Sequence, residues 1–284
     1  MSVRLQVLAA LPRLLVPDVA RSVAWYRDVL GFTVCDVIGD PPELAILDVA
    51  PGQGLHLARA VDGKARPQRG EDGKGIDMYL RLAASDAERF VAHARAHAPD
   101  RVGPTHDRPW KMRETFFVDE EGFAMCVAGD LTGERRAGTA QLSPELLVAD
   151  VGRAASFYRD ALGFTIINLI DNPPGYALVE RDGALLHLAL ADDPARVRST
   201  HAIDGGHDVY LELHGVDALA EELRVRGVEL VRGPETMEWE QRELDVRDAD
   251  GHLLRFAEDQ CFDPDDPSSE RIGVLRDAPW RGVS

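Results

Sequence analysis

The sequence predicts an α+β protein that consists of four β-α-β-β-β modules arranged as two tandem copies of one domain. The first observation behind this prediction is an internal repeat. Residues 14–33 (LLVPDVARSVAWYRDVLGFT) recur as residues 146–165 (LLVADVGRAASFYRDALGFT), with thirteen of twenty positions identical. Such a long spacing exceeds any solenoid repeat and is close to the size of a domain. The second observation is the order of the patterns. In each copy a helical pattern is followed by several strand patterns, and this order then occurs a second time.

Each repeat begins with a short apolar strand that leads into a helix. Asp18 and Asp150 follow these strands and are favourable N-cap residues. Apolar side chains then recur at helical spacing, and Gly31 or Gly163 stands where the helix should end in a left-handed conformation. The Phe-Thr pair after each glycine opens a β-rich segment.

A strand and a hairpin follow each of these helices. In the first copy the predicted strands cover residues 32–38, 44–49 and 55–60, with two prolines in the first turn. In the second copy the hairpin strands cover residues 176–181 and 184–190. The centres of the matching LHLA strands are occupied by His56 and His187.

The second half of each copy repeats the same order of elements. In the first copy a strand at 76–82 precedes a helix from Ser85 to about residue 97, whose SDAE start matches a capping box. In the second copy the strand covers 208–213 and the helix 217–226. A loop and two final strands complete each module, and the loops contain Trp110 and Trp239.

These patterns predict two domains, at residues 1–130 and 142–260, and an acidic, proline-rich tail at 261–284. The modules cover about residues 9–60 and 75–128 in the first domain, and about 142–191 and 206–259 in the second. The sequence leaves open whether the modules pair within one copy or across the two copies.

Composition indicates a bacterial, cytoplasmic protein with no nucleic-acid or membrane partner. The net charge is −17, from 32 basic and 49 acidic residues, whereas nucleic acids and anionic membranes require a basic face. The first apolar run is interrupted by Pro12 and Arg13 and is too short for a signal peptide or a membrane span. The three cysteines have no ligand-like spacing and fit a reducing compartment.

The four modules resemble the vicinal oxygen chelate superfamily, which includes glyoxalase I, extradiol dioxygenases, fosfomycin-resistance enzymes and bleomycin-resistance proteins. The motifs WYRDVLGF and FYRDALGF carry this resemblance. Two loops, PWKMRE at 109–114 and EWEQRE at 238–243, and the strand DADGHLLRF are similar to the PWGxRE loop and the DPDGNLLRF strand of the bleomycin-resistance branch. The resemblance covers about residues 10–259 and implies two glyoxalase-like cupped mixed sheets.

In the superfamily's enzymes, four strands each supply one ligand to a divalent metal. The resemblance maps these positions to Leu11, His56, Asp77 and Cys126 in the first copy and to Ser143, His187, Asp208 and Arg255 in the second. The usual glutamate of the last strand is missing from both copies, and a guanidinium repels a cation. We therefore expect no cofactor. The alternative is a divalent metal such as Zn, Ni, Fe or Mn, held by His56, Asp77 and Cys126.

A ligand-binding site is expected on the inner face of each sheet. Strand parity places Tyr79 and Arg81 beside Asp77, and Tyr210 and Glu212 beside Asp208. Arg255 should then lie close enough to Asp208 to neutralise it, and the loop tryptophans could stack on a ligand. The predicted ligand-binding residues are His56, His187, Trp110, Trp239, Tyr79, Tyr210, Asp77, Asp208 and Arg255.

Each of these residue types also has a structural interpretation. The histidines could be hydrogen-bonded within the sheet, and the tryptophans could cover their own core. Arg113 with Glu114, and Arg242 with Glu243, are expected to form ion pairs at the strand starts. Cys126 is expected to be a small core residue.

The predicted function is the sequestration, without catalysis, of an aromatic or cationic small molecule such as an antibiotic. Bleomycin-resistance proteins are dimers with grooves between subunits, so the resemblance implies a monomer that acts as an internal pseudo-dimer, or a homodimer. One alternative is a metal-dependent lyase, isomerase or dioxygenase with a His/Asp site. Another is an enzyme that uses one of the histidines as a general acid or base.

Overall fold

The computed structural model describes residues 5–68, 75–201 and 205–260. The predicted tail at 261–284 lies outside the described residues. The described part of the chain divides into two compact units, one formed by residues 13–142 and the other by residues 143–260 together with residues 5–12. We call them the first-copy unit and the second-copy unit.

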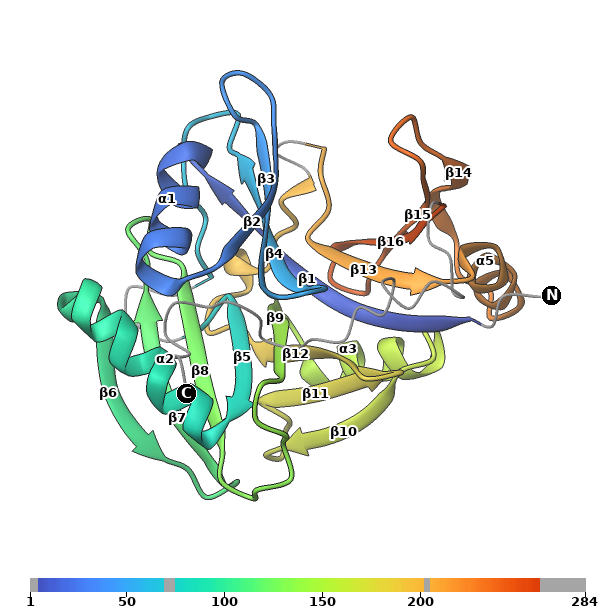
Figure 1. Ribbon diagram of the computed structural model, residues 1–284. Coiled ribbons are helices and arrows are strands. Elements are labelled where there is room, and N and C mark those ends of the chain that lie inside the picture. The colour runs from blue at the N-terminus through green and yellow to red at the C-terminus, as the bar shows by residue number, and fades with distance from the viewer. Residues whose placement is uncertain (1–4, 69–74, 202–204, 261–284) are drawn as a thin grey trace. The chain divides into compact units, whose positions relative to one another are not determined.

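Each unit contains two β-α-β-β-β modules, and α2 lies across the strands of its own module (Figure 1). In the first-copy unit the elements are β1 (Gln6–Val16, second half), α1 (Val19–Leu30), β2 (Thr33–Ile38), β3 (Leu44–Ala50), β4 (Gln53–Arg59), β5 (Met78–Ala83), α2 (Ala84–His97), β6 (Val102–Asp107), β7 (Met112–Val118) and β8 (Ala124–Asp130).

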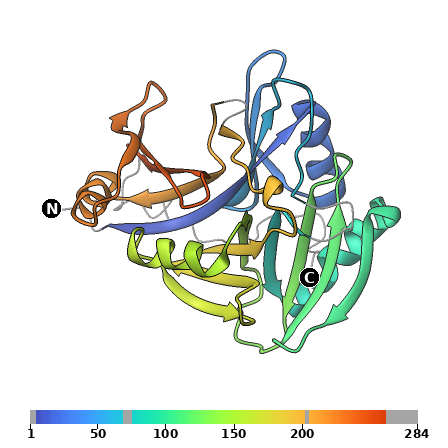
Figure 2. The same ribbon diagram turned by 180° about the vertical axis from the view of Figure 1, so that it is seen from behind.

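The second-copy unit repeats this order of elements. Figure 2 shows its first helix, in yellow-green, beside the strands of the same module. The elements are β9 (Ala140–Val148), α3 (Val151–Asp160), β10 (Thr165–Ile170), β11 (Tyr176–Arg181), β12 (Ala184–Leu190), β13 (Val209–His214), α5 (Val216–Val225), β14 (Leu230–Thr236), β15 (Gln241–Arg247) and β16 (Leu253–Asp259).

The strands form two eight-stranded mixed sheets. Their orders are β14-β15-β16-β13-β1-β4-β3-β2 and β10-β11-β12-β9-β5-β8-β7-β6. Residues Gln6 to Pro12 of β1 pair antiparallel with β13, and residues Arg13 to Val16 pair parallel with β4. The predicted α+β fold with two mixed sheets is confirmed.

Capping residues set the limits of the two repeated helices. Asp18 and Asp150 each accept a hydrogen bond from the backbone amide three residues on, at 3.0 and 2.9 Å. Gly31 and Gly163 have a φ of 73°, the left-handed region that a side chain would disfavour. Helix α1 thus ends at Gly31 as predicted, whereas α3 ends at Asp160 with Ala161 as its cap, and the left-handed Gly163 follows two residues after that cap.

The capping box predicted for the next helix is wrong. The N-cap of α2 is Ala83, which makes no side-chain bond to the helix amides. Asp86 of the SDAE segment is fully buried and accepts a hydrogen bond from the amide of Gly138, at 2.6 Å. Glu88, the acidic residue of the predicted box, pairs with Arg113 at 2.7 Å.

The tyrosine of the repeated motif lies in the apolar core of each unit. Tyr26 and Tyr158 are completely buried, and their hydroxyls donate to Asp119 and Asp248, at 3.1 Å in both cases. A buried hydroxyl without a partner would be costly. The repeated motif therefore ties the first helix of each copy to the last turn of its second module.

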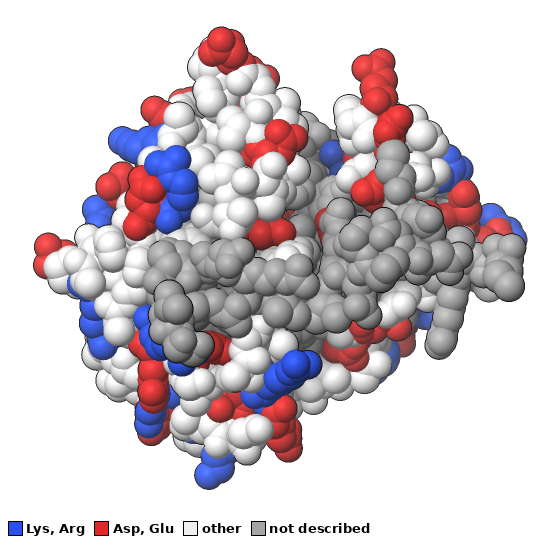
Figure 3. All heavy atoms as spheres, viewed as in Figure 1, with Lys and Arg blue, Asp and Glu red and all other residues white. Residues whose placement is uncertain are grey.

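The surface in Figure 3 carries acidic and basic side chains interspersed over the face in view. None of the helices that the structure describes is long and apolar enough to cross a membrane.

Candidate ligand-binding faces

In the second-copy unit, the face of the β10-β11-β12 strands opposite α3 is mainly apolar. Ala177 and Val179 of β11 pack into the core below α3, so Tyr176 and Leu178 point to the opposite side. Ile170 pairs with Tyr176 across the strands and is 45% exposed. Exposed apolar side chains on a sheet face are typical of a binding surface.

Three polar side chains form a hydrogen-bonded chain on this face. His187 is buried, with its Nε2 atom 3.0 Å from Ser143 Oγ and its Nδ1 atom 2.5 Å from the Tyr176 hydroxyl. Burial lowers the pKa of His187 to about 3, so the ring is neutral. Tyr176 was not among the predicted site residues. Strand alternation in the predicted hairpin places Tyr176 on the same side of the sheet as His187, and this signal could have identified it.

In the first copy, apolar residues stand at the sequence positions of Tyr176 and Ser143. His56 is buried on β4, opposite Ile46 of β3. The positions that correspond to Tyr176 and Ser143 are Leu44 and Leu11. Ile38 at the end of β2 pairs with Leu44 and is 47% exposed. Both copies therefore expose apolar side chains here, and the second copy adds a polar chain.

Asp77 and Asp208, which the resemblance mapped to ligand positions, hold backbone amides instead. Asp77 accepts hydrogen bonds from the amides of Gln68 and Ala124, both at 2.7 Å. Asp208 does the same with the amides of Thr200 and Leu253, also at 2.7 Å. Each carboxylate thus ties the preceding loop to the last strand of its module, and both oxygen atoms are used in doing so.

Trp110 is anchored at the centre of a polar cluster on the sheet face opposite α2. Its indole Nε1 donates to Glu114 Oε1 at 2.9 Å, while the side chain as a whole is 57% exposed. The buried carboxylate of Glu114 also accepts from the Tyr79 hydroxyl at 3.0 Å and from Arg108 Nε at 2.9 Å. The Arg108 guanidinium lies 5.8 Å from the centre of the Trp110 ring.

Trp239 repeats this arrangement in the second-copy unit. Its Nε1 donates to Glu243 Oε1 at 3.0 Å, and the side chain is again 57% exposed. The Tyr210 hydroxyl, however, donates to Gln241. Burial raises the pKa of Tyr210 well above its usual value. Both loop tryptophans are therefore fixed at one edge and remain half exposed, although Arg108 lies over the ring of Trp110.

Arg255 forms an ion pair, but not with the expected partner. Its Nε and Nη2 atoms lie 2.9 and 3.0 Å from the two oxygens of Asp245, which Arg232 also contacts. Burial alone would raise the pKa of Asp245, but these hydrogen bonds hold it below its usual value. The predicted pair between Asp208 and Arg255 is wrong because Asp208 is occupied by backbone amides.

The two copies differ most at one cross-strand pair on these faces. In the first copy Phe116 pairs with Cys126, and Cys126 packs against Ile76. In the second copy the equivalent pair is Asp245 with Arg255. An apolar pair in one copy is thus replaced by an ion pair in the other.

The residues of the alternative metal site do not fit a metal. His56 lies in one sheet and Cys126 in the other, while both oxygens of Asp77 accept backbone hydrogen bonds. Among the described residues, no three His, Cys, Asp or Glu side chains are grouped so that they could hold a metal ion.

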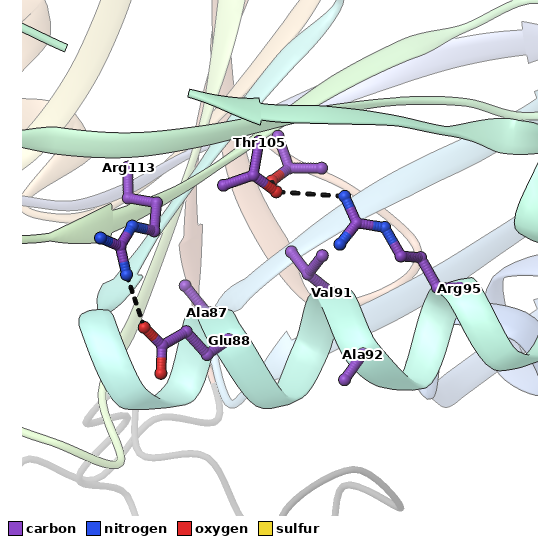
Figure 4. A pocket seen from close by; sticks show the side chains of 8 residues that line it. Ala87, Glu88, Val91, Ala92, Arg95, Thr105 and Arg113 are labelled. Atoms are coloured by element: carbon purple, nitrogen blue, oxygen red, sulfur yellow. Dashed lines mark hydrogen bonds and ion pairs between the residues drawn. The ribbon is translucent and has the colours of Figure 1, made fainter. Parts of the chain in front are cut away.

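A separate cavity of about 290 Å³ lies between α2 and the strands β6 and β7 (Figure 4). Arg113, on its rim, binds Glu88 at 2.7 Å and Asp107 at 2.7 Å, and Arg95 binds Thr105 at 3.1 Å. Arg113 points away from its neighbour Glu114, so the expected Arg-Glu pair is wrong. These polar groups bind one another above a floor of small apolar side chains.

Comparisons with known proteins agree with this architecture. A bleomycin resistance protein from Geobacillus stearothermophilus is 29% identical over 130 residues, which cover 41% of this chain and 94% of that protein. A bleomycin resistance protein from Staphylococcus aureus matches to the same extent. The crystal structure of glyoxalase I from Zea mays has a TM-score of 0.58 at 16% identity and covers 90% of this chain and 93% of its own, which shows a common fold.

The family model of the Glyoxalase/Bleomycin resistance protein/Dioxygenase superfamily matches twice, at residues 6–127 and 140–256. The two matches coincide with the two copies of the repeat. The chain therefore belongs to the Glyoxalase/Bleomycin resistance protein/Dioxygenase superfamily.

Proposed function

We propose that this protein binds and sequesters a planar aromatic, cationic small molecule, as the name of its bleomycin resistance relatives suggests for those proteins. The observation that carries the proposal is the state of the two loop tryptophans. Trp110 and Trp239 each expose 57% of their surface although a buried glutamate fixes the indole edge. A tryptophan that covered its own core would bury its ring faces. A fixed, open indole is suited to stacking on a planar ring.

The charge of the surroundings favours a cation. The protein carries a net charge of −17, which attracts cations. The buried carboxylate behind each indole is itself paired with an arginine, Glu114 with Arg108 and Glu243 with Arg232. An indole face also attracts cations through its quadrupole. We propose that no metal takes part, because Asp77 and Asp208 hold backbone amides and Arg255 occupies the last ligand position of the second copy.

Titration calorimetry of the full-length protein with bleomycin and with acridinium tests the proposal. Each of Trp110→Ala and Trp239→Ala should weaken binding of the ligand at its face by roughly 1–2 kcal/mol, the contribution of a stacked or cation–π contact. Trp110→Phe should retain most of the affinity, since it keeps an aromatic face and loses only the bond to Glu114.

Trp25→Phe provides the matched control, because Trp25 is buried on α1 and contacts the core. It should leave binding unchanged. Unaltered affinity of both alanine variants, with their folding verified by thermal denaturation, would show that the tryptophans do not bind the ligand and would refute the proposal.

A further inference from the structure

The cavity between α2 and the strands β6 and β7 has an arginine at each end (Figure 4). Arg113, at one end, is paired with two carboxylates. Arg95, at the other end, donates through Nη2 to the carbonyl of Gly103 at 3.0 Å and to the hydroxyl of Thr105 at 3.1 Å. Both of these acceptors are neutral. Within the described part of the chain, the charge of Arg95 is therefore not balanced, and its Nε and Nη1 donors have no partner.

The space between the two arginines is apolar and small. Ala87 and Val91 project from α2 toward the strands between the two ends of the cavity (Figure 4). Val91 is 8% exposed, so little of its surface is in contact with water. The volume of about 290 Å³ is at the lower end of the roughly 300–1,000 Å³ that small-molecule sites occupy. The cavity therefore suits a short aliphatic group.

The charges at the two ends give the cavity a polarity. Glu88 and Asp107 both bind Arg113 at 2.7 Å, so two anions surround one cation at that end. The opposite end has the cation of Arg95 alone. An anionic group on a ligand is repelled from the first end and attracted to the second. A guanidinium is well suited to binding a carboxylate through charge-assisted hydrogen bonds.

The second copy lacks the features that distinguish this cavity. Asp217 binds Arg242 there, at 2.8 and 2.6 Å, as Glu88 binds Arg113 in the first copy, and this contact aligns the two helices. In this alignment Arg224 corresponds to Arg95 and is paired with Glu221 at 2.6 Å.

Glu221 corresponds to Ala92, which has no charge. The strand residues Thr105 and Thr115 correspond to Pro234 and Leu244. The first copy alone thus combines an arginine without a carboxylate partner and hydroxyl-bearing strands at this position.

We propose that this cavity is a second binding site, for a small monocarboxylate with a short aliphatic chain. The carboxylate accepts hydrogen bonds from Nε and Nη1 of Arg95, and the chain lies along Ala87 and Val91. The site is separate from the loop tryptophans, and it does not depend on the proposed function.

A titration with hexanoate tests the proposal. The reporters are the Val91 methyl signals of the full-length, ¹³C-labelled protein, assigned from their loss in Val91→Ile. Hexanoate should shift these signals saturably, and hexan-1-ol, which has the same chain without the charge, should bind about fivefold more weakly. Acetate has the charge without the chain and should produce no saturable shift, because it buries too little apolar surface.

Ala92→Glu gives the first copy the residue that pairs with the arginine in the second. Ala92 and Arg95 are both exposed, so the fold should tolerate this change. The new carboxylate should occupy Arg95 and lower the affinity for hexanoate to that for hexan-1-ol, with the affinity for hexan-1-ol unchanged. Arg95→Gln should have the same effect.

Ser85→Glu is the matched control. It adds the same charge to the same helix at an exposed position, about 15 Å along the axis from Arg95. It should leave both affinities unchanged. Thermal denaturation verifies that each variant is folded.

Three outcomes would overturn the proposal. The absence of a saturable shift with hexanoate would show that the cavity binds no such ligand. Equal affinities for hexanoate and hexan-1-ol would exclude the carboxylate as the recognised group. Wild-type affinity for hexanoate in folded Ala92→Glu, or an equal loss in Ser85→Glu, would show that Arg95 does not hold the carboxylate.

Discussion

The aspartate that accepts from the motif tyrosine has a different neighbour in each copy. In the first copy Asp119 lies beside Phe123, and burial raises the pKa of Asp119 to about 6. In the second copy the equivalent of Phe123 is His252, whose Nδ1 lies 3.0 Å from Asp248. Burial would raise the pKa of Asp248 too, but the hydrogen bond from His252 holds it below its usual value. The exchange of Phe123 for His252 thus accompanies a reversal in the direction of the aspartate pKa shift, which is upward in Asp119 and downward in Asp248.

This difference predicts a pH dependence of stability. Because the pKa of Asp119 is raised in the folded protein, folding favours the protonated carboxyl group. The stabilisation that this gives to the folded state is fully present below about pH 4. It is lost as the pH rises through about 6. Asp119→Asn, which cannot ionise, should therefore gain roughly 1–2 kcal/mol of unfolding free energy relative to wild type between pH 4.5 and pH 8. Urea unfolding at both pH values measures it.

Asp248→Asn is the matched comparison. Because the pKa of Asp248 is lowered in the folded protein, its contribution is present at neutral pH and is lost on acidification. This variant should lose stability relative to wild type at pH 8. If Asp119→Asn lost the same stability at both pH values, the ionisation of Asp119 would not be what limits stability at neutral pH.

At the scale of elements, Asp77 and Asp208 close the loop between the hairpin and the next strand. Asp77 binds one amide in this loop, at Gln68, and one at the start of the last strand of the module, at Ala124. Asn can accept at only one of these positions, because its second terminal atom is a donor that would face an N–H group. We therefore expect Asp77→Asn to cost roughly 2 kcal/mol in unfolding free energy, as a buried donor loses its partner.

The same variant separates a structural role from ligand binding. Chemical denaturation measures the loss of stability, and calorimetry with bleomycin should show unchanged affinity for the folded fraction. Tyr79→Phe is a suitable comparison, since Tyr79 lies on the ligand face and bonds to Glu114. A loss of affinity in Asp77→Asn without any loss of stability would contradict the structural role.

The elements themselves could be predicted from sequence because their signals are local. The hairpin strands of the second copy begin and end where the apolar alternation and the Asp-Gly turn place them, at residues 176–181 and 184–190. The parity that places Tyr79 and Arg81 on one face of β5 is also local. The partners of Asp77, Asp208 and Arg255 could not be predicted, because backbone amides and residues ten or more positions away compete for them.

At the scale of the whole chain, the two copies share a frame and have diverged on the sheet faces that we propose to bind ligands. The caps, the buried motif tyrosines and the anchored tryptophans are common to both copies. The cross-strand pair Phe116–Cys126, by contrast, has become Asp245–Arg255, and Leu44 corresponds to Tyr176. In a duplicated chain, the sheet face of one copy can accumulate substitutions while the other copy keeps its original residues. We therefore expect the two faces to prefer different ligands.

The last prediction concerns the metal content of the intact protein. After dialysis against Zn²⁺, Ni²⁺, Fe²⁺ or Mn²⁺ and removal of the excess, elemental analysis should find less than about one tenth of an equivalent per chain, because no three His, Cys, Asp or Glu side chains converge among the described residues. In the second copy the Nε2 atom of His187 is bonded to Ser143, and Arg255 lies in the other sheet, where it is paired with Asp245.

Arg255→Glu provides the test of that argument, since it installs the carboxylate that the superfamily's metal sites carry. It should still bind no stoichiometric metal, because Asp208 remains engaged by the amides of Thr200 and Leu253. Stoichiometric metal in the wild-type protein, removed by His187→Ala, would show that these side chains rearrange to form a metal site, and would favour an enzyme over a sequestering protein.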